Sequence, residues 1–236
     1  MTEPTGAITT RGSRQALGYA LAAAVVSLVL WNVPIANLVL YPLRILVTLI
    51  HEGGHALATV VTGGAVQGMA VNPDGSGVTY SAGGWGILIA PAGYLGAAAF
   101  GAVLLWLLQG SRAGRRALYL TAGVAAVITV LFVRNLFGLG AGLGLTLALA
   151  AAARYLPPLA ALFLSAFLAV QFILNAFLDL INLTFSSGFF AIGHNDAVLM
   201  ARLIPLPPIV WALLWAILAA LLVVWLARAL WRGATR

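Results

Sequence analysis

The stretch Leu49-Ile50-His51-Glu52-Gly53-Gly54-His55-Ala56-Leu57 (LIHEGGHAL) places two histidines and an acid inside a long apolar run. The chain of 236 residues has 3 histidines and 5 acidic residues, and charged residues make up 7% of it. Ionisable side chains within an apolar helix are costly and indicate a functional site. The stretch therefore predicts a membrane-embedded helix with a site on it.

The composition is that of a membrane protein. Hydrophobic residues make up 63% of the chain and the mean hydropathy is +1.06, whereas a soluble protein is about half apolar and a quarter charged. Apolar runs of roughly 18 to 25 residues recur, and each is long enough to cross ~30 Å of hydrocarbon. We expect an all-α polytopic membrane protein with about six or seven transmembrane helices.

The net charge of +7 comes entirely from arginine, because the chain has no lysine. Most arginines flank the apolar runs, in short loops and near both ends of the chain: Arg11, Arg14, Arg112, Arg115, Arg116, Arg228, Arg232 and Arg236. Basic flanks of this kind anchor helices at the lipid headgroups. The lipid bilayer is thus an expected partner, and nucleic acid is not. The lack of cysteine excludes disulfides and thiolate metal ligands.

A polar, glycine-rich segment interrupts the expected helices after the second of them. Residues 1–14 form a polar tail and 15–236 a single transmembrane domain. Helices are expected at about 15–33, 35–62, 85–109, 115–133, 136–153, 159–185 and 210–231. Residues 63–84 are glycine-rich and contain Asn72-Pro73-Asp74-Gly75, a turn signal between two short strand-like runs. We expect a β-hairpin there, directly after the helix that carries the histidines.

His51 and His55 are four residues apart, so on a helix they lie on one face, one turn apart. Two imidazoles so placed can bind one metal ion, and Glu52 beside them can reach a metal-bound water. This is the HExxH pattern of zinc metallopeptidases, in which the glutamate is the general base. We predict one zinc ion bound by the two histidines, with Glu52 as the catalytic residue.

Plainer interpretations of the same stretch remain open. A buried, hydrogen-bonded cluster of histidine and glutamate in a water-lined cavity would explain the polar residues without catalysis. Gly53 and Gly54 could let another backbone approach the metal, or they could pack against neighbouring helices.

A catalytic zinc site needs a third protein ligand, and few acids remain. Glu3 lies in the tail, and the turn alone explains Asp74. Asp179 falls late in an expected spanning helix, whereas Asp196 falls in a polar break before the last helix. Both Asp179 and Asp196 are candidate ligands.

Three more polar side chains lie near these two aspartates. His194 is a further ligand candidate, although an interfacial or capping role explains it more simply. Asn175 and Asn182 flank Asp179 along one helix. They could hydrogen-bond a substrate or an oxyanion, or they could join helices within lipid.

Four segments resemble the bacterial branch of the site-2 protease family, which comprises intramembrane zinc metallopeptidases with HExxH in a membrane helix. They are HEGGHALATVVTGGAVQGMAVNPDGSGVTY (51–80), APAGYLGAAAFGA (90–102), NAFLDLINL (175–183) and NDAVLMARLIPLPPIVWALLW (195–215). The resemblance implies zinc at His51 and His55, Glu52 as base, and a hairpin that presents substrate as an added strand. Better-known members take the third ligand from a Leu-Asp-Gly-type motif, and Asp196 is the closest counterpart here. We therefore predict Asp196 as the third ligand and keep Asp179 as the alternative.

The expected function is zinc-dependent intramembrane endopeptidase activity on a peptide bond in or near a substrate's transmembrane segment, as in regulated intramembrane proteolysis. The partner would be a membrane-protein substrate, bound by strand addition to the 63–84 hairpin, in a bacterial plasma membrane. The alternative is a non-proteolytic metal-binding membrane protein, either a transporter or a degenerate scaffold. A transporter would carry acids along a path through the membrane and often a repeated half, and the sequence shows neither.

Overall fold

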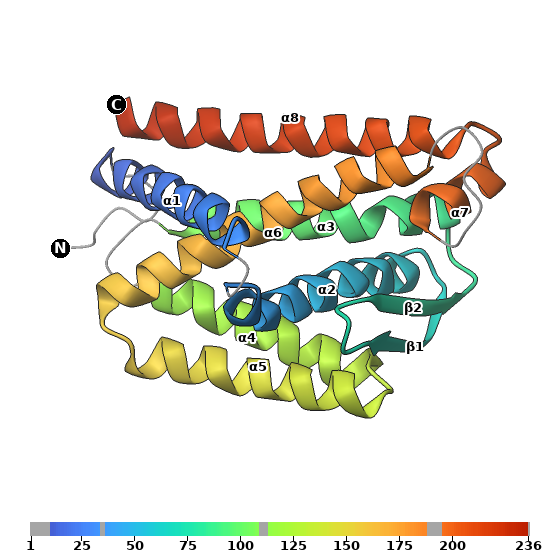
Figure 1. Cartoon of the computed structure of the whole chain (residues 1–236), viewed down its shortest axis with the longest axis horizontal. Coiled ribbons are helices and arrows are strands. Elements are labelled where there is room, and N and C mark those ends of the chain that lie inside the picture. The colour runs from blue at the N-terminus through green and yellow to red at the C-terminus, as the bar shows by residue number, and fades with distance from the viewer. Residues whose placement is uncertain (1–9, 34–35, 109–112, 188–194, 236) are drawn as a thin grey trace.

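The structure, a computed structural model, describes residues 10–33, 36–108, 113–187 and 195–235. These residues form eight helices and one two-stranded antiparallel sheet (Figure 1). The elements are α1 (Thr10–Trp31), α2 (Ala36–Val61), β1 (Ala65–Val71), β2 (Gly77–Ala82), α3 (Gly86–Leu107), α4 (Ala113–Phe132), α5 (Leu136–Tyr155), α6 (Pro158–Ser187), α7 (Asp196–Leu203) and α8 (Pro208–Thr235).

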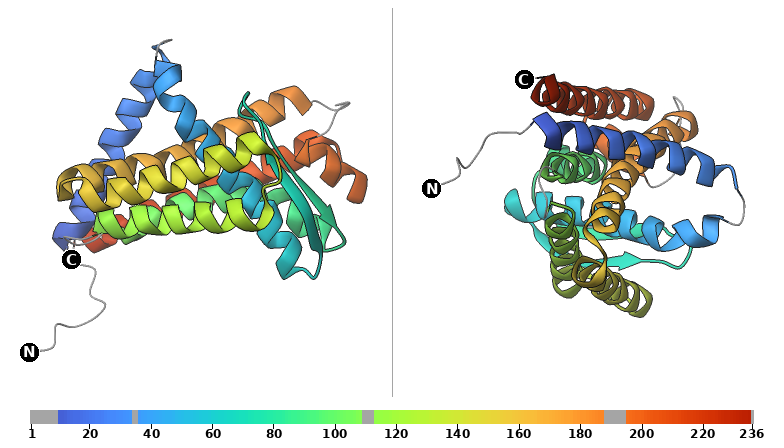
Figure 2. Two further views of the ribbon diagram at one scale, coloured as in Figure 1. Left: turned by 90° about the horizontal axis from the view of Figure 1, so that it is seen from below. Right: turned by 90° about the vertical axis from the view of Figure 1, so that its left-hand side faces the viewer.

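The long helices α3, α4, α5, α6 and α8 form a bundle along the long axis of the molecule (Figure 1). Among the described residues, these five helices are long and apolar enough to cross a membrane, which is fewer than the six or seven transmembrane helices expected from the sequence. Helices α1 and α2 meet in a V beside the bundle (Figure 2). The all-α polytopic architecture with a small hairpin is thus confirmed, and the chain is an integral, multi-pass membrane protein.

The two ends of the bundle differ in charge. Helix α1 begins and α8 ends at the end where α4 starts and α5 finishes (Figures 1 and 2). Exposed Arg115 and Arg116 lie in the first turn of α4, Arg154 lies in the last turn of α5, and Arg228 lies late in α8. The Arg115 guanidinium donates to the Leu156 carbonyl oxygen at 3.2 Å. We call the end of the bundle that carries these four residues the arginine end. The hairpin and α7 lie at the opposite end.

The predicted turn at 72–75 is confirmed. The Asp74 carboxylate accepts hydrogen bonds from the backbone N–H of Ser76 at 2.9 Å and from its hydroxyl at 2.7 Å. These hydrogen bonds, together with the nearby charge of Arg44, lower the pKa of the Asp74 carboxyl. Gly75 has a φ of 86°, which residues with a side chain rarely adopt. Asp74 therefore has a structural role in the turn.

The outer edge of β1 is closed by the junction between α4 and α5. The backbone N–H of Arg134 donates to the carbonyl of Met69 at 2.8 Å. The Asn135 carboxamide pairs with the backbone of Val71, accepting from its N–H at 3.1 Å and donating to its carbonyl at 2.7 Å. We call residues 133–135 the β1 bracket, because they fix the hairpin to the helical bundle.

The remaining differences from the sequence predictions are local. Helix α1 begins at Thr10, so residues 10–14 of the expected polar tail are helical, and residues 1–9 lie outside the described part. Polar side chains are tolerated in a helix that starts before the lipid. Helix α7 was not predicted, because its eight residues lie within a stretch interpreted as a polar break.

Candidate metal centre

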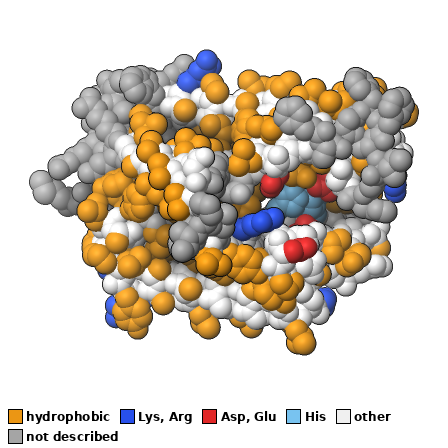
Figure 3. All heavy atoms as spheres, viewed as in Figure 1, with side chains coloured by type: hydrophobic (Ala, Val, Ile, Leu, Met, Phe, Trp, Pro, Cys, Tyr) orange, Lys and Arg blue, Asp and Glu red, His pale blue; other side chains and the backbone are white. Residues whose placement is uncertain are grey.

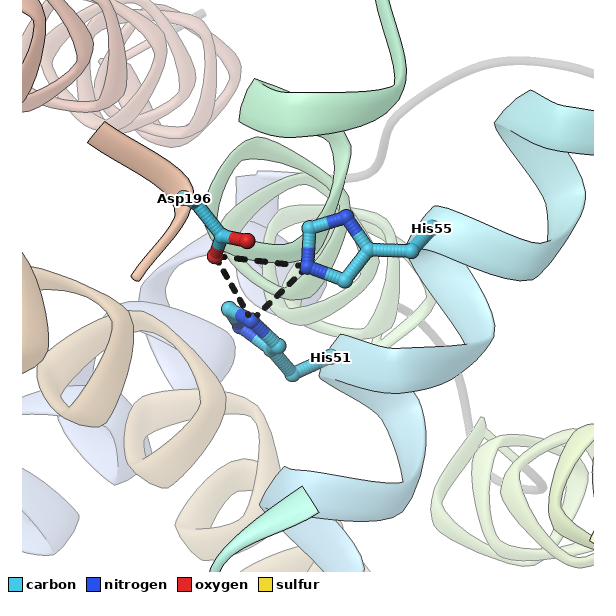
Figure 4. Close-up of side chains that lie close together, drawn as sticks. All are labelled: His51, His55 and Asp196. Atoms are coloured by element: carbon cyan, nitrogen blue, oxygen red, sulfur yellow. Dashed lines mark hydrogen bonds and ion pairs between the residues drawn. The ribbon is translucent and has the colours of Figure 1, made fainter. Parts of the chain in front are cut away.

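The candidate metal centre is assembled from α2 and α7. His51 and His55 lie one turn apart on the face of α2 that turns toward α7, and Asp196 is the first residue of α7 (Figure 4). The Asn195 side chain caps α7 by accepting the backbone N–H of Val198 at 2.9 Å. This cap fixes the first turn of α7 and thereby the backbone that carries the aspartate.

The three donor atoms form a nearly equilateral triangle. The two imidazole Nε2 atoms are 3.1 Å apart. Asp196 Oδ2 lies 3.5 Å from Nε2 of His51 and 3.4 Å from Nε2 of His55. Tetrahedral zinc with bonds of about 2.0 to 2.1 Å separates its ligand atoms by about 3.3 Å. The size of the triangle and its nitrogen and oxygen donors therefore fit three protein ligands of one zinc ion.

The ring of His55 is oriented by a backbone carbonyl. Its Nδ1 lies 2.7 Å from the carbonyl oxygen of Ile89 on α3. Because a carbonyl can only accept, Nδ1 carries the proton, and Nε2 is left with a free lone pair toward the other two donors. This tautomer is the one that a metal-binding histidine needs.

The ring of His51 packs against one aromatic side chain, which is itself packed against a second. Tyr94 packs edge-on against His51, with ring centroids 4.5 Å apart. Trp215 of α8 stacks on Tyr94 at 6.0 Å, and both aromatic residues are buried. The ring therefore has little freedom to leave the triangle.

Space for an ion is kept open by a glycine. A Cβ built on Gly93 of α3 would lie 2.5 Å from Nε2 of His55 and closer still to Nε2 of His51. A methyl group at this position would occupy the volume between the two nitrogens. Gly93 thus provides a cradle beside the donor atoms that any side chain would fill.

Glu52 lies in the same region but outside the triangle. Its side chain is buried, and its Oε2 accepts the hydroxyl hydrogen of Thr79 on β2 at 2.7 Å. It therefore remains available for a role other than metal binding.

The site opens into a cavity of about 910 Å³ that is bounded by α2, the hairpin, α3, α6 and α7. His51, His55, Glu52 and Asp196 all line it. Figure 3 shows the histidine side chains in an opening, with acidic side chains around them on an otherwise largely hydrophobic face.

The charge state of Asp196 follows from its neighbours. Burial works to raise the pKa of its carboxyl, but hydrogen bonds from His51 and His55 outweigh burial and bring the pKa below its ordinary range. An ionised carboxylate is the form that binds a cation.

The other predicted candidates lie outside the triangle of His51, His55 and Asp196 or outside the described residues. Asp179 and Asn182 line the cavity from α6, but Asp179 is not part of the triangle. Asn175 donates to the backbone carbonyl of Gln171 within α6 at 2.8 Å. His194 lies outside the described residues.

Gly53 and Gly54 are both used for helix packing. A Cβ on Gly53 would overlap the side chain of Ile128 on α4, and one on Gly54 would overlap the backbone carbonyl of Ala92 on α3. Of the two interpretations, the structure supports the one in which they pack against neighbouring helices.

Comparison with known protein families gives a match to "Peptidase M50B-like" over residues 20–226. The chain belongs to this family. The match confirms the resemblance to site-2 proteases and indicates a site-2 protease-like intramembrane metallopeptidase. No curated protein and no solved structure matches the chain.

Several residues of this M50B-like centre were not singled out from the sequence. Thr79, Gly93 and Tyr94 contact the HExxH residues from distant parts of the chain. The one available signal was a Gly-Tyr pair in the segment 90–102, which carries part of the family resemblance. Thr79 gave no signal, because threonine is common in strands.

Proposed function

We propose that the protein is a zinc-dependent intramembrane endopeptidase that hydrolyses a peptide bond in or near a transmembrane segment of its substrate. The observation that carries the proposal is the triangle of His51, His55 and Asp196, which opens into the same cavity as Glu52. These three residues would hold the ion. Zinc bound there would supply Lewis acidity and bring the pKa of a water ligand to near 7.

Glu52 would be the general base. Its carboxylate is buried but lines the cavity, so it can accept a proton from a water molecule that attacks a peptide carbonyl. The same carboxylate can return that proton to the leaving amine. A carboxylate held outside the metal triangle is suited to both transfers.

The substrate would bind along the free edge of β2. Met69 and Val71 direct backbone groups outward from β1 to the bracket, and they face Thr79 and Gly77 in the register. In an antiparallel sheet, two residues that face each other either both point their backbone N–H and C=O groups at the partner strand or both point them away from it. The backbone groups of Gly77 and Thr79 therefore point to the outer edge of β2.

That edge borders the cavity, because Gly77 and Thr79 line it. An unwound substrate segment could add to β2 as a third strand and satisfy its own backbone groups there. This would bring a peptide bond of a membrane-protein substrate beside the proposed zinc site.

The proposal is tested with Glu52→Gln, which removes the base but keeps the shape of the side chain. Protein purified in detergent with zinc is incubated with fluorescein-labelled casein, an unfolded protein probe, and bound zinc is measured separately. We expect Glu52→Gln to keep about one zinc per chain and to lose at least about 100-fold in cleavage rate. Unchanged cleavage would refute the endopeptidase, and zinc uptake into proteoliposomes that survives Glu52→Gln would support a non-proteolytic metal-binding protein.

A further inference from the structure

The hydroxyl group of Thr79 is bonded to the proposed general base. Thr79 Oγ1 lies 2.7 Å from Glu52 Oε2 and 3.1 Å from the Glu52 backbone carbonyl oxygen. A hydroxyl has one hydrogen to donate. The contact to the carboxylate oxygen Oε2 is the shorter of the two, so the hydrogen is directed to it. Thr79 thus fixes one carboxylate oxygen of Glu52 and leaves Oε1 unoccupied by this bond.

Strand β2 has little freedom to move relative to α2. A Cβ on Gly77 would lie 2.6 Å from Glu52 Cγ and 2.7 Å from Glu52 Oε1, so the strand backbone touches the glutamate side chain. Ser81 and Thr59 form a second link between β2 and α2, with hydroxyl oxygens 2.7 Å apart.

The neighbouring strand β1 also fixes the position of Thr79. It faces Met69 in the register, and Met69 is fully buried and bonded to the β1 bracket. The hydroxyl is therefore held at a defined place in the molecule and does not depend on a mobile loop.

We propose that Thr79 is a positioning residue for Glu52 and that it links the substrate-binding edge of β2 to the general base. The proposal rests on the endopeptidase function proposed above. The side chain of Thr79 holds the glutamate while its backbone groups face the free edge of the same strand. A substrate strand bonded to that edge would lie directly against the residue that holds the carboxylate, which would place its scissile bond beside Glu52.

The test compares Thr79→Val, Thr79→Ser and Ser81→Ala in the casein assay, with bound zinc and thermal unfolding measured on each variant. Valine keeps the branched shape and strand preference but has no hydroxyl, whereas serine keeps the hydroxyl. Ser81→Ala is the matched control, since it removes a bond of the same length between β2 and α2 without touching Glu52.

We expect Thr79→Val to lower kcat by roughly 10- to 100-fold with little change in KM and with zinc retained, as for loss of an outer-shell partner. Thr79→Ser should restore most of kcat, and Ser81→Ala should lower it much less than Thr79→Val does. If Thr79→Val fails to fold, Thr79→Ala replaces it. Alanine places no methyl group where the Thr79 hydroxyl contacts Glu52, and this variant is expected to show the same loss of kcat.

Wild-type kcat in Thr79→Val, or an equal loss in Thr79→Val and Ser81→Ala, would overturn the positioning role. If Glu52→Gln is inactive in the same assay while Thr79→Val is fully active, the Thr79 proposal fails and the endopeptidase stands. If Glu52→Gln is active, the endopeptidase itself fails.

Discussion

Nδ1 of His55 lies 2.7 Å from the carbonyl oxygen of Ile89, so the other nitrogen of the ring is directed at His51 and Asp196. Ile89 lies in the first turn of α3, a helix that also supplies Gly93 and Tyr94. Helix α3 thus orients the ring of His55 through Ile89, packs Tyr94 against His51, and leaves space beside both rings at Gly93. Through these three contacts, the geometry of the candidate metal site depends on the position of α3 relative to α2.

The third ligand can be identified by comparing two aspartates that both line the cavity. We expect Asp196→Ala to reduce zinc affinity by more than the roughly 10- to 100-fold that loss of an outer-shell partner costs, because it removes a corner of the triangle. Asp179→Ala should keep one zinc per chain, since Asp179 is outside the triangle. Zinc content after dialysis against a competing chelator measures both, and the reverse result would assign the ligand to Asp179.

The cradle beside the donor atoms can be filled with a single methyl group. Gly93→Ala places a Cβ between the two Nε2 atoms, so we expect it to abolish stoichiometric zinc binding. Gly96→Ala is the matched control on the same helix, because its Cβ would meet Gly54 Cα at an ordinary 3.5 Å. Metal content and thermal unfolding of the two variants measure the effect. Wild-type zinc affinity in Gly93→Ala would show that the ion does not lie against α3.

The orientation in the membrane follows from the arginine end. Arginine is retained on the cytoplasmic side of bilayers, so we expect the arginine end to face the cytoplasm and the hairpin end to face away from it. The chain contains no cysteine, which allows single-cysteine labelling without a background. Leu136 and Tyr155, the first and last residues of α5, are 89% and 79% exposed and provide one probe at each end.

A membrane-impermeant maleimide should therefore label Leu136→Cys in intact spheroplasts and label Tyr155→Cys only after permeabilisation. Labelling in the opposite order would place the hairpin and the metal centre on the cytoplasmic side.

Local sequence patterns were sufficient to predict much of the fold and half of the site. The spacing of His51 and His55 put both on one face of a helix, and the turn signal at 72–75 located the hairpin. These features depend on neighbours a few residues apart, where helix and turn geometry are fixed.

The contacts that complete the site could not be predicted in this way. Thr79 is 27 residues from Glu52, and Asn135 is 64 residues from Val71. Such pairs depend on how distant elements pack against one another, and local patterns in a single sequence do not reveal that packing. Asp196 was predicted through the family resemblance and because few acids remained, and the cap at Asn195 that positions it went unnoticed.

The bracket on β1 also affects how copies of this protein behave in a crowded bilayer. Exposed strand edges invite pairing between molecules and lead to aggregation. Here Asn135 and Arg134 occupy one edge of the sheet, and the other edge borders the cavity at the candidate metal centre. A foreign strand can therefore pair with this sheet only at the β2 edge beside the cavity, so the same feature that fixes the hairpin also closes its β1 edge to strands of neighbouring molecules.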